Sequence, residues 1–196
     1  MTLPDPKDRS FFQQPTLNLA KALLGKLLVK ETDEGITAGF IVETEAYIGP
    51  GDQAAHSFQN RRTKRTEVMF GPPGYTYTYV MHTHCLVNVV SGEVDHPEAV
   101  LIRAVEPHLG IELMYERRGI NKKEVELTNG PGKLTKAFDI RKEDYGRPLY
   151  TPPLYIAEGP TPSSISSGPR IGIPNSGAAK NYQWRFWVTN NRFVSK

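Results

Sequence analysis

The run from Ile36 to Tyr47 constrains the fold most, because it is the longest strand-like pattern in the chain. Its β-branched and aromatic residues are typical of a strand, and Gly49-Pro50-Gly51 ends it. Leu27–Lys30 is a shorter run of the same kind, joined to it through the turn segment Thr32–Gly35. The two segments therefore predict an antiparallel hairpin.

Strand patterns outnumber helical ones along the rest of the chain. Further strands are predicted at Tyr75–Met81, Leu86–Val90, Glu98–Val105, Arg170–Ile173 and Trp184–Val188. Helices are predicted from Thr16, as the N-cap, to Gly25, at His108–Arg118 and at Lys133–Phe138. The sequence therefore predicts one α+β domain over residues 1–196, with a mixed, mainly antiparallel sheet. Residues 1–15 are expected to be an extended lead-in, and the Pro-, Ser- and Gly-rich residues 151–170 a long surface loop.

Composition excludes several classes of protein. Of the 196 residues 38% are hydrophobic and 23% charged, which is enough apolar material for a packed core. No apolar run reaches the roughly 18 residues of a membrane span, and the polar N-terminus carries no signal-peptide pattern. Cys85 is the one cysteine, so a disulfide framework and a Cys-rich zinc module are excluded. We expect an intracellular protein with no membrane contact.

Basic residues gather in two places although the net charge is only +3. Residues 159–196 contain five Lys or Arg and no acidic residue, and a second group comprises Arg61, Arg62, Lys64 and Arg65. Both groups can pair with phosphates, and both can equally be solvated surface. Lys133 follows Asn129-Gly130-Pro131-Gly132, which lacks the spacing of a nucleotide-binding loop but opens a helix whose N-terminus can hold one phosphate.

Two carboxylates interrupt the otherwise apolar strand 36–47. Regular alternation places Glu43 and Glu45 on one face with Ile41 and Tyr47. That face is either in water or at the edge of a site, where one Glu acts as a general base. A glycosidase that uses both carboxylates is a third interpretation.

Aromatic and histidine residues cluster near the middle of the chain. Tyr75, Tyr77 and Tyr79 share one strand face, which favours either ordinary cross-strand packing or a platform for a stacked base. His82, His84 and Cys85 have the composition of a metal site, but no complementary ligand lies at an obvious spacing, so packing is favoured.

Taken in order, several blocks resemble the alkyladenine (3-methyladenine) DNA glycosylase family. The matching blocks are residues 19–25 (LAKALLG), 42–50 (VETEAYIGP), 54–57 (AAHS), 69–70 (MF), 73–74 (PG), 100–107 (VLIRAVEP), 130–134 (GPGKL) and 170–173 (RIGI). Together they span nearly the whole chain, and the series is far more specific than any single block.

The resemblance implies a curved antiparallel sheet with peripheral helices, and an enzyme that flips a damaged purine out of duplex DNA and hydrolyses its N-glycosidic bond. It implies no metal or other cofactor and no covalent intermediate. By resemblance Glu45 is the general base, Arg103 and the backbone carbonyl of Ile171 hold the water, and Glu43 is an outward or supporting neighbour. The pocket residues implied in the same way are Tyr47, His56, Tyr79 and Asn88, the last opposing the guanine 2-amino group. We expect a monomeric, cytoplasmic bacterial protein.

The residue that fills the gap left by the flipped base falls at a shortened junction. Counting from Tyr79 places His82 at the position of this wedge, whereas counting back from Asn88 places Met81 there. Minor-groove wedges are usually apolar, which suits Met81. A non-catalytic nucleic-acid-binding protein of the same fold is the alternative function, although it has no need to keep both Glu45 and Arg103.

Overall fold

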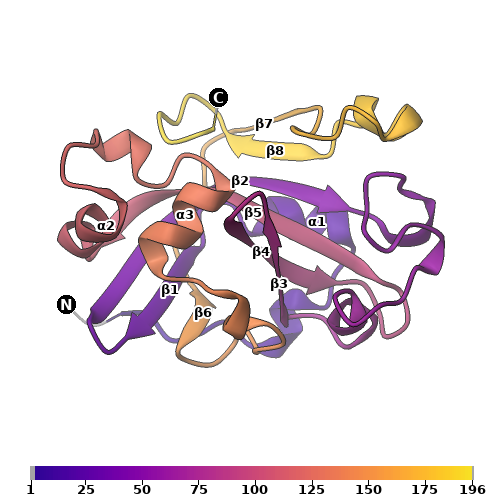
Figure 1. The fold of residues 1–196 in the computed structure, drawn as a ribbon, viewed down its shortest axis with the longest axis horizontal. Helices are drawn as coiled ribbons and strands as arrows, with labels where there is room; N and C mark the ends of the chain where they lie inside the picture. The colour runs from indigo at the N-terminus through magenta and orange to yellow at the C-terminus, as the bar shows by residue number, and fades with distance from the viewer. Residues whose placement is uncertain (1–2, 196) are drawn as a thin grey trace.

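Eight antiparallel strands form one curled sheet in the computed structural model, which describes residues 3–195 (Figure 1). The strands are β1 (Leu27–Thr32), β2 (Gly35–Tyr47), β3 (Thr76–Met81), β4 (His84–Ser91), β5 (Glu98–Leu109), β6 (Leu154–Ala157), β7 (Ile165–Gly168) and β8 (Arg185–Val188). Their order is β3-β4-β5-β2-β1-β6, with β8 pairing with both β2 and β7. The predicted α+β class is confirmed. Residues 1–2 of the predicted lead-in and the basic Lys196 lie outside the described residues.

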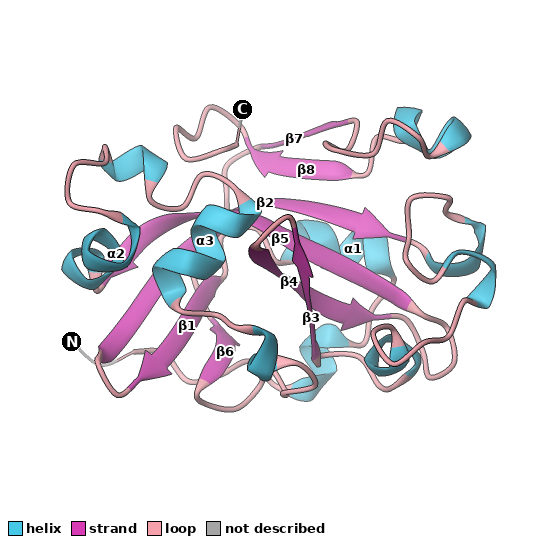
Figure 2. Ribbon diagram, viewed as in Figure 1, coloured by secondary structure: helices cyan, strands magenta, loops and turns pink. Residues whose placement is uncertain are grey.

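Within residues 3–195 three α-helices accompany the sheet, and Figure 2 draws helical segments in cyan. They are α1 (Thr16–Ala22), α2 (Ile111–Arg118) and α3 (Pro131–Phe138). All three contribute to one apolar core, since Leu19 of α1, Met114 of α2 and Phe138 of α3 are fully buried in the same cluster. The helices therefore lie against the sheet as peripheral elements, as predicted.

Strand β2 is the centre of the sheet. It pairs with β5 along one edge, whereas the other edge is shared by β1 over its first half and β8 at residues 43–45. A strand with neighbours on both edges is fully hydrogen-bonded and rigid, so β2 is a firm base for functional side chains. The predicted hairpin of β1 and β2 is confirmed.

The pairing of β2 with β5 has three register shifts, and the two beyond Ile41 are opposed bulges. Between Ile41 and Glu43 the extra residue lies on β2, and immediately afterwards Arg103 is the extra residue on β5. Bulges re-aim side chains. Ile41 consequently packs into the helix-covered core, while Glu43 and Glu45 face the opposite side with Tyr47. The expected grouping of Ile41 with the two glutamates is therefore wrong.

Three segment assignments from the sequence need correction. Residues 151–170 are not one loop, because they contain β6 and β7, each held by a ladder to a neighbouring strand. Arg170–Ile173 is not a strand but a loop. Strand β5 continues to Leu109, so α2 begins only after Gly110, whose φ of 72° is left-handed.

Two local details concern the start of α1 and the junction after β3. Thr16 is not an N-cap but the first residue of α1, and its hydroxyl instead contacts Ser91 at 2.8 Å. The junction after β3 is a tight hairpin, in which His82 and Thr83 form a two-residue turn with φ of 54° and 104°. Such turns join twisted antiparallel strands without splaying them.

Gly25 offers a test of the packing behind β2. Its φ is +82°, and a Cβ at this position would overlap the carbonyl oxygen of Pro160. Gly25→Ala should therefore lower the free energy of unfolding by about 2 kcal/mol or more, measured by urea denaturation. Gly51→Ala is the matched control, because no heavy atom lies within 4 Å of its Cβ position, and it should change stability by less than about 0.5 kcal/mol. Equal midpoints for the two variants would contradict this account.

Candidate active site

A pocket of about 240 Å³ opens on the face of the sheet opposite the main core. Its lining comes from β2, β3, β4, β5, the loop after β2, the start of α3 and the loop after β7. The residues are Tyr47, Ala54, His56, Met69, Tyr77, Tyr79, Met81, Leu86, Asn88, Ala99, Leu101, Arg103, Pro131, Ile171, Gly172 and Ile173. The structure thus brings together every pocket residue expected from the sequence. The volume is below that of sites for drug-sized ligands and suits one flat ring system.

Glu45 is completely buried beside this pocket. Its Oε2 accepts a hydrogen bond from the Tyr47 hydroxyl at 2.8 Å, and its Oε1 accepts one from the backbone N–H of Ile171 at 2.7 Å. This contact comes from the N–H of Ile171, whereas the expected role of its carbonyl, holding the water, stays a prediction. Each carboxylate oxygen can accept two hydrogen bonds, so Oε2 retains a free acceptor direction.

Tyr47 stands between the carboxylate and the pocket. Burial, reinforced by the neighbouring Glu45, raises the pKa of the Tyr47 hydroxyl well above its usual value. The hydroxyl therefore stays protonated and donates to Glu45. Arg170 lies over the same ring, 4.6 Å from its centroid, and fixes the plane in which the ring can stack.

Glu43 is the unexpected member of the strand pair. It has no solvent exposure at all, so neither an outward carboxylate nor a solvated strand face describes it. Arg103 Nε donates to its Oε1 at 3.0 Å, and Arg185 Nε lies 3.0 Å from the same oxygen. Ser195 donates to it twice, from the backbone N–H at 2.7 Å and from the hydroxyl at 2.9 Å.

Arg103 links the two carboxylates. Besides the contact with Glu43, its Nη1 lies 3.3 Å from Glu45 Oε1. Burial alone would lower the pKa of Arg103, but the adjacent carboxylates of Glu45 and Glu43 outweigh it, and the pKa is raised. The guanidinium is thus a permanent positive charge in the wall of the pocket.

A hydrogen-bonded aromatic pair forms another wall. His56 Nδ1 lies 2.7 Å from the Tyr77 hydroxyl, and the Tyr79 ring meets the His56 ring edge-on at 4.6 Å between centroids. Burial lowers the pKa of His56 to about 4, assisted by Arg65 and Arg61, and raises that of Tyr79 to about 12. Both side chains are therefore neutral near pH 7 and can contact an apolar ring.

A backbone hydrogen bond holds the side-chain amide of Asn88 next to this wall. Its Nδ2 donates to the carbonyl of Tyr77 at 3.0 Å, across the β3–β4 ladder. Asn88 is almost fully buried and also lines the pocket. The hydrogen bond fixes which atoms of the amide face the cavity.

A buried ion pair supports three walls of the pocket at once. Arg170 and Asp52 have fully buried side chains and make a two-point pair, at 2.5 and 2.8 Å. Asp52 also accepts the backbone N–H groups of Ile48 and Ala54, while Arg170 donates to the carbonyl of Ala46. Neither residue was among those expected from the sequence.

The hairpin between β3 and β4 projects at the mouth of the pocket. Met81 is 46% exposed and lines the pocket, whereas His82 is exposed in the turn and does not line it. Gly132 of α3 packs against this hairpin so closely that a Cβ there would lie 2.7 Å from the Cβ of His84. Among residues 3–195 no group of three or more His, Cys, Asp or Glu side chains is placed to hold a metal ion.

The basic residues of the loop after β2 are placed unequally. Arg61 and Arg65 border a hollow next to His56, and both are exposed, as are Lys64 and Lys133. Arg62 differs, because Glu67 holds it at two points and Asp95 lies 3.4 Å away. Its charge is therefore already largely balanced within the protein.

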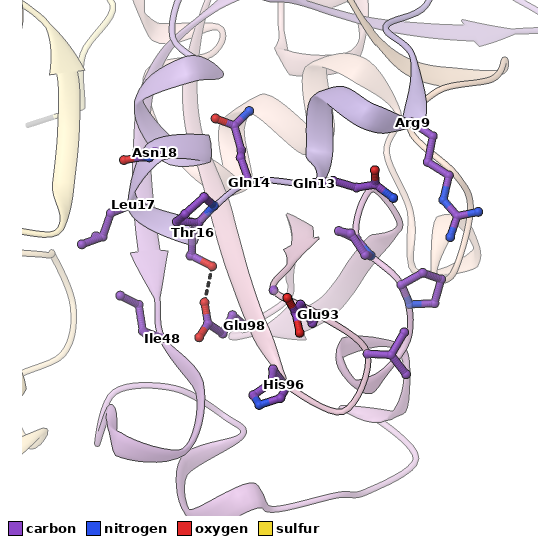
Figure 3. Close-up of a pocket in the computed structure, with 15 residues that line it drawn as sticks. Arg9, Gln13, Gln14, Thr16, Leu17, Asn18, Ile48, Glu93, His96 and Glu98 are labelled. Atoms are coloured by element: carbon purple, nitrogen blue, oxygen red, sulfur yellow. Dashed lines mark hydrogen bonds between the residues drawn. The ribbon is translucent and has the colours of Figure 1, made fainter.

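A larger cavity, of about 910 Å³, lies elsewhere, between the lead-in, the start of α1 and the turn from β4 to β5 (Figure 3). Its acidic residues are Glu93 and Glu98, and Glu98 accepts a hydrogen bond from Thr16 (Figure 3). The cavity has neither the aromatic walls nor the carboxylate–guanidinium pair of the smaller pocket. The smaller pocket is therefore the candidate active site.

Comparison with known proteins agrees with this choice. The sequence profile of methylpurine-DNA glycosylase matches residues 10–192. The chain belongs to this family of DNA repair glycosylases, whose substrate is DNA. A Bacillus licheniformis protein is 63% identical over 192 residues, covering 98% of this chain and 97% of its own length. A Listeria monocytogenes protein is 46% identical over 188 residues, covering 95% and 91%. Both are named "Putative 3-methyladenine DNA glycosylase".

Sequence reasoning missed Asp52, Arg170, Arg185 and Ser195 as parts of the site. Arg170 stands in a block that resembles the family, but a basic residue in an acid-free tail gives no sign of burial. Ser195 gives no sequence signal, because its role depends on where the chain end folds back. No helix among the described residues is long and apolar enough to cross a membrane.

Because His56 is neutral in the folded chain, the free energy of unfolding should fall in acid. The pKa of His56 is about 4 in the folded chain and about 6.5 when unfolded, so between these values the unfolded chain binds more protons. This contribution to stability, about 3 kcal/mol, is present above pH 6.5 and is lost as the pH falls towards 4. His56→Gln should therefore show a shallower acid-side loss in urea unfolding. A ring-nitrogen NMR titration with a midpoint above pH 6 would refute the assignment.

Proposed function

We propose that this chain is a monofunctional glycosylase that flips a damaged purine out of duplex DNA and hydrolyses its N-glycosidic bond. The observation that carries the proposal is Glu45, fully buried and held at both oxygens beside an aromatic pocket sized for one base. Alkylated and deaminated purines such as 3-methyladenine and hypoxanthine are the proposed substrates. The chain acts as a monomer in the bacterial cytoplasm, where it meets the chromosome.

Glu45 is the proposed general base. A water placed at its free Oε2 direction gives up a proton to the carboxylate while its oxygen attacks the sugar carbon that held the base. The negative carboxylate also stabilises the positive charge that develops on the sugar ring as the bond to the base breaks. Water is itself the nucleophile, so no covalent intermediate with the enzyme forms. Arg103 holds the carboxylate and the water in the relative positions that the proton transfer needs.

The flipped base is held between Tyr47 on one side and His56 with Tyr79 on the other. Stacking of an electron-poor base on these rings gains about 0.5–2 kcal/mol when the base is cationic. Asn88 limits the pocket, because its amide is tied to Tyr77 and cannot move aside for the 2-amino group of a guanine. Undamaged guanine is rejected in this way.

The hairpin and the basic loop are the proposed contacts with the duplex. Met81 is the proposed wedge, since it is apolar, exposed and adjacent to the pocket, whereas His82 lies beyond it in the turn. Phosphates are contacted by the exposed basic residues Arg61, Lys64, Arg65 and Lys133, to which Arg62 adds less because its charge is already paired.

Neither alternative function accounts for the geometry as well. A non-catalytic DNA-binding protein has no use for a buried carboxylate beside an aromatic pocket, since burying a charge is costly. A two-carboxylate carbohydrate hydrolase needs Glu43 free to react. Glu43 is instead enclosed by two arginines and Ser195.

Glu45→Gln tests the proposal directly. The amide keeps the shape but cannot accept a proton, so release of hypoxanthine or 3-methyladenine from a duplex should fall by about 10²-fold or more. Binding to the same duplex, measured by fluorescence anisotropy, should stay within about threefold, because Glu45 faces the sugar and not the phosphates. Single-turnover release near the wild-type rate would sink the assignment of the base.

Met81→Ala and His82→Ala test the wedge. Extrusion of a base costs a few kcal/mol of stacking, and a side chain in the gap offsets part of this cost. Met81→Ala should therefore slow release from a paired duplex more than release from single-stranded DNA, while His82→Ala should slow both little. A duplex-selective loss of activity in His82→Ala alone would identify His82, in the turn, as the wedge. If neither variant shows such a loss, the β3–β4 hairpin does not supply the wedge.

A further inference from the structure

The guanidinium of Arg103 is shared unequally between the two buried carboxylates. Towards Glu43 it makes a directed hydrogen bond from Nε at 3.0 Å, and its Nη2 donates to the Ser195 hydroxyl at 3.3 Å. Towards Glu45 it makes only a single close approach from Nη1, at 3.3 Å. Two of its three nitrogens are thus committed away from the proposed base.

This arrangement opposes the pairing that arginine normally prefers. A free guanidinium binds a carboxylate at two points, with parallel N–H···O contacts to both oxygens. Such a pair with Glu45 would fill the one acceptor direction left open at Oε2, beside the hydrogen bond from Tyr47. Glu45 would then have no place for the proton of a water.

The contacts of Glu43 keep Arg103 away from two-point pairing with Glu45. Both of its oxygens are occupied, since Oε2 accepts the Ser195 N–H while Oε1 accepts the Ser195 hydroxyl and Arg103 Nε. Arg185, stacked on Trp187 at 4.6 Å, lies against Oε1 as a second positive charge. Two carboxylates therefore face two guanidinium groups, and the buried charges balance.

We propose that Glu43 and Ser195 are positioning residues that keep Arg103 from pairing at two points with Glu45, so that Glu45 stays free to take a proton from water. This inference rests on the proposed function. It gives the segment after β8 a specific part in the reaction, because Ser195 reaches both oxygens of Glu43.

The experiment compares Glu43→Gln and Ser195→Ala with the wild-type chain in single-turnover release of hypoxanthine from a duplex. Release should slow by about 10-fold or more in Glu43→Gln and by about threefold or more in Ser195→Ala. Duplex affinity should change less than about twofold in both, since neither residue lies at the DNA surface. Ser166→Ala is the matched control, because it loses only a hydrogen bond to Thr189 in the turn after β8 and should keep the wild-type rate.

A double-mutant cycle separates positioning from simple support of the fold. If Glu43 acts through Arg103, then Glu43→Gln combined with Arg103→Gln should be no slower than Arg103→Gln alone. Losses that multiply, or wild-type rates in both Glu43→Gln and Ser195→Ala, would overturn the inference. Thermal unfolding identifies the folded variants, and Ser195→Ala carries the test if Glu43→Gln does not fold. No base release by the wild-type chain would instead overturn the proposed function, and this inference with it.

Discussion

The buried pairing of Glu43 and Glu45 with Arg103 and Arg185 is the constraint on which the rest of the structure depends. A lone carboxylate at zero exposure would be prohibitively costly, and two on one strand would also repel each other. The cluster is tolerable only because two guanidinium groups and several N–H and O–H donors reach it from β5, β8, the loop after β7 and the C-terminal segment. Removing one partner of such a set leaves an uncompensated charge, so the cluster couples the geometry around the proposed base to the integrity of the fold.

The opposed bulges in β2 and β5 are what make this pairing geometrically feasible. In a regular ladder Ile41 would share a face with Glu43, and an apolar side chain would intrude on the charged cluster. The bulge at residues 41–43 turns Ile41 into the core, and the compensating bulge at Arg103 turns the guanidinium towards the carboxylates. The register on either side is retained, so the distortion stays local and the sheet continues beyond it.

Long strands, the fold class and the pocket residues were within reach of sequence reasoning, because they depend on local patterning and on motifs that keep their order. The strands within residues 151–170 could not be predicted in this way. β6 and β7 are short edge segments, and they are held as strands by pairing with β1 and β8 rather than by their own composition. Bulges leave no reliable local signature, which is why regular strand alternation predicts the wrong face for Ile41. The burial of Arg170 and Ser195 is a tertiary property, set by Asp52 and Glu43 far away in the chain.

The Asp52–Arg170 ion pair fixes the loop segments that line the pocket. Three of the pocket's sides come from loops or a strand end, and such segments are usually the more mobile parts of a fold. The pair ties Ile48 and Ala54 of one loop, Ala46 of β2 and the loop that carries Ile171 to a single buried contact. Because the Ile171 N–H reaches Glu45, the placement of the proposed base depends on an ion pair outside the pocket. The charged cluster and the Asp52–Arg170 pair therefore act on Glu45 from two directions, one through Arg103 and the other through the backbone.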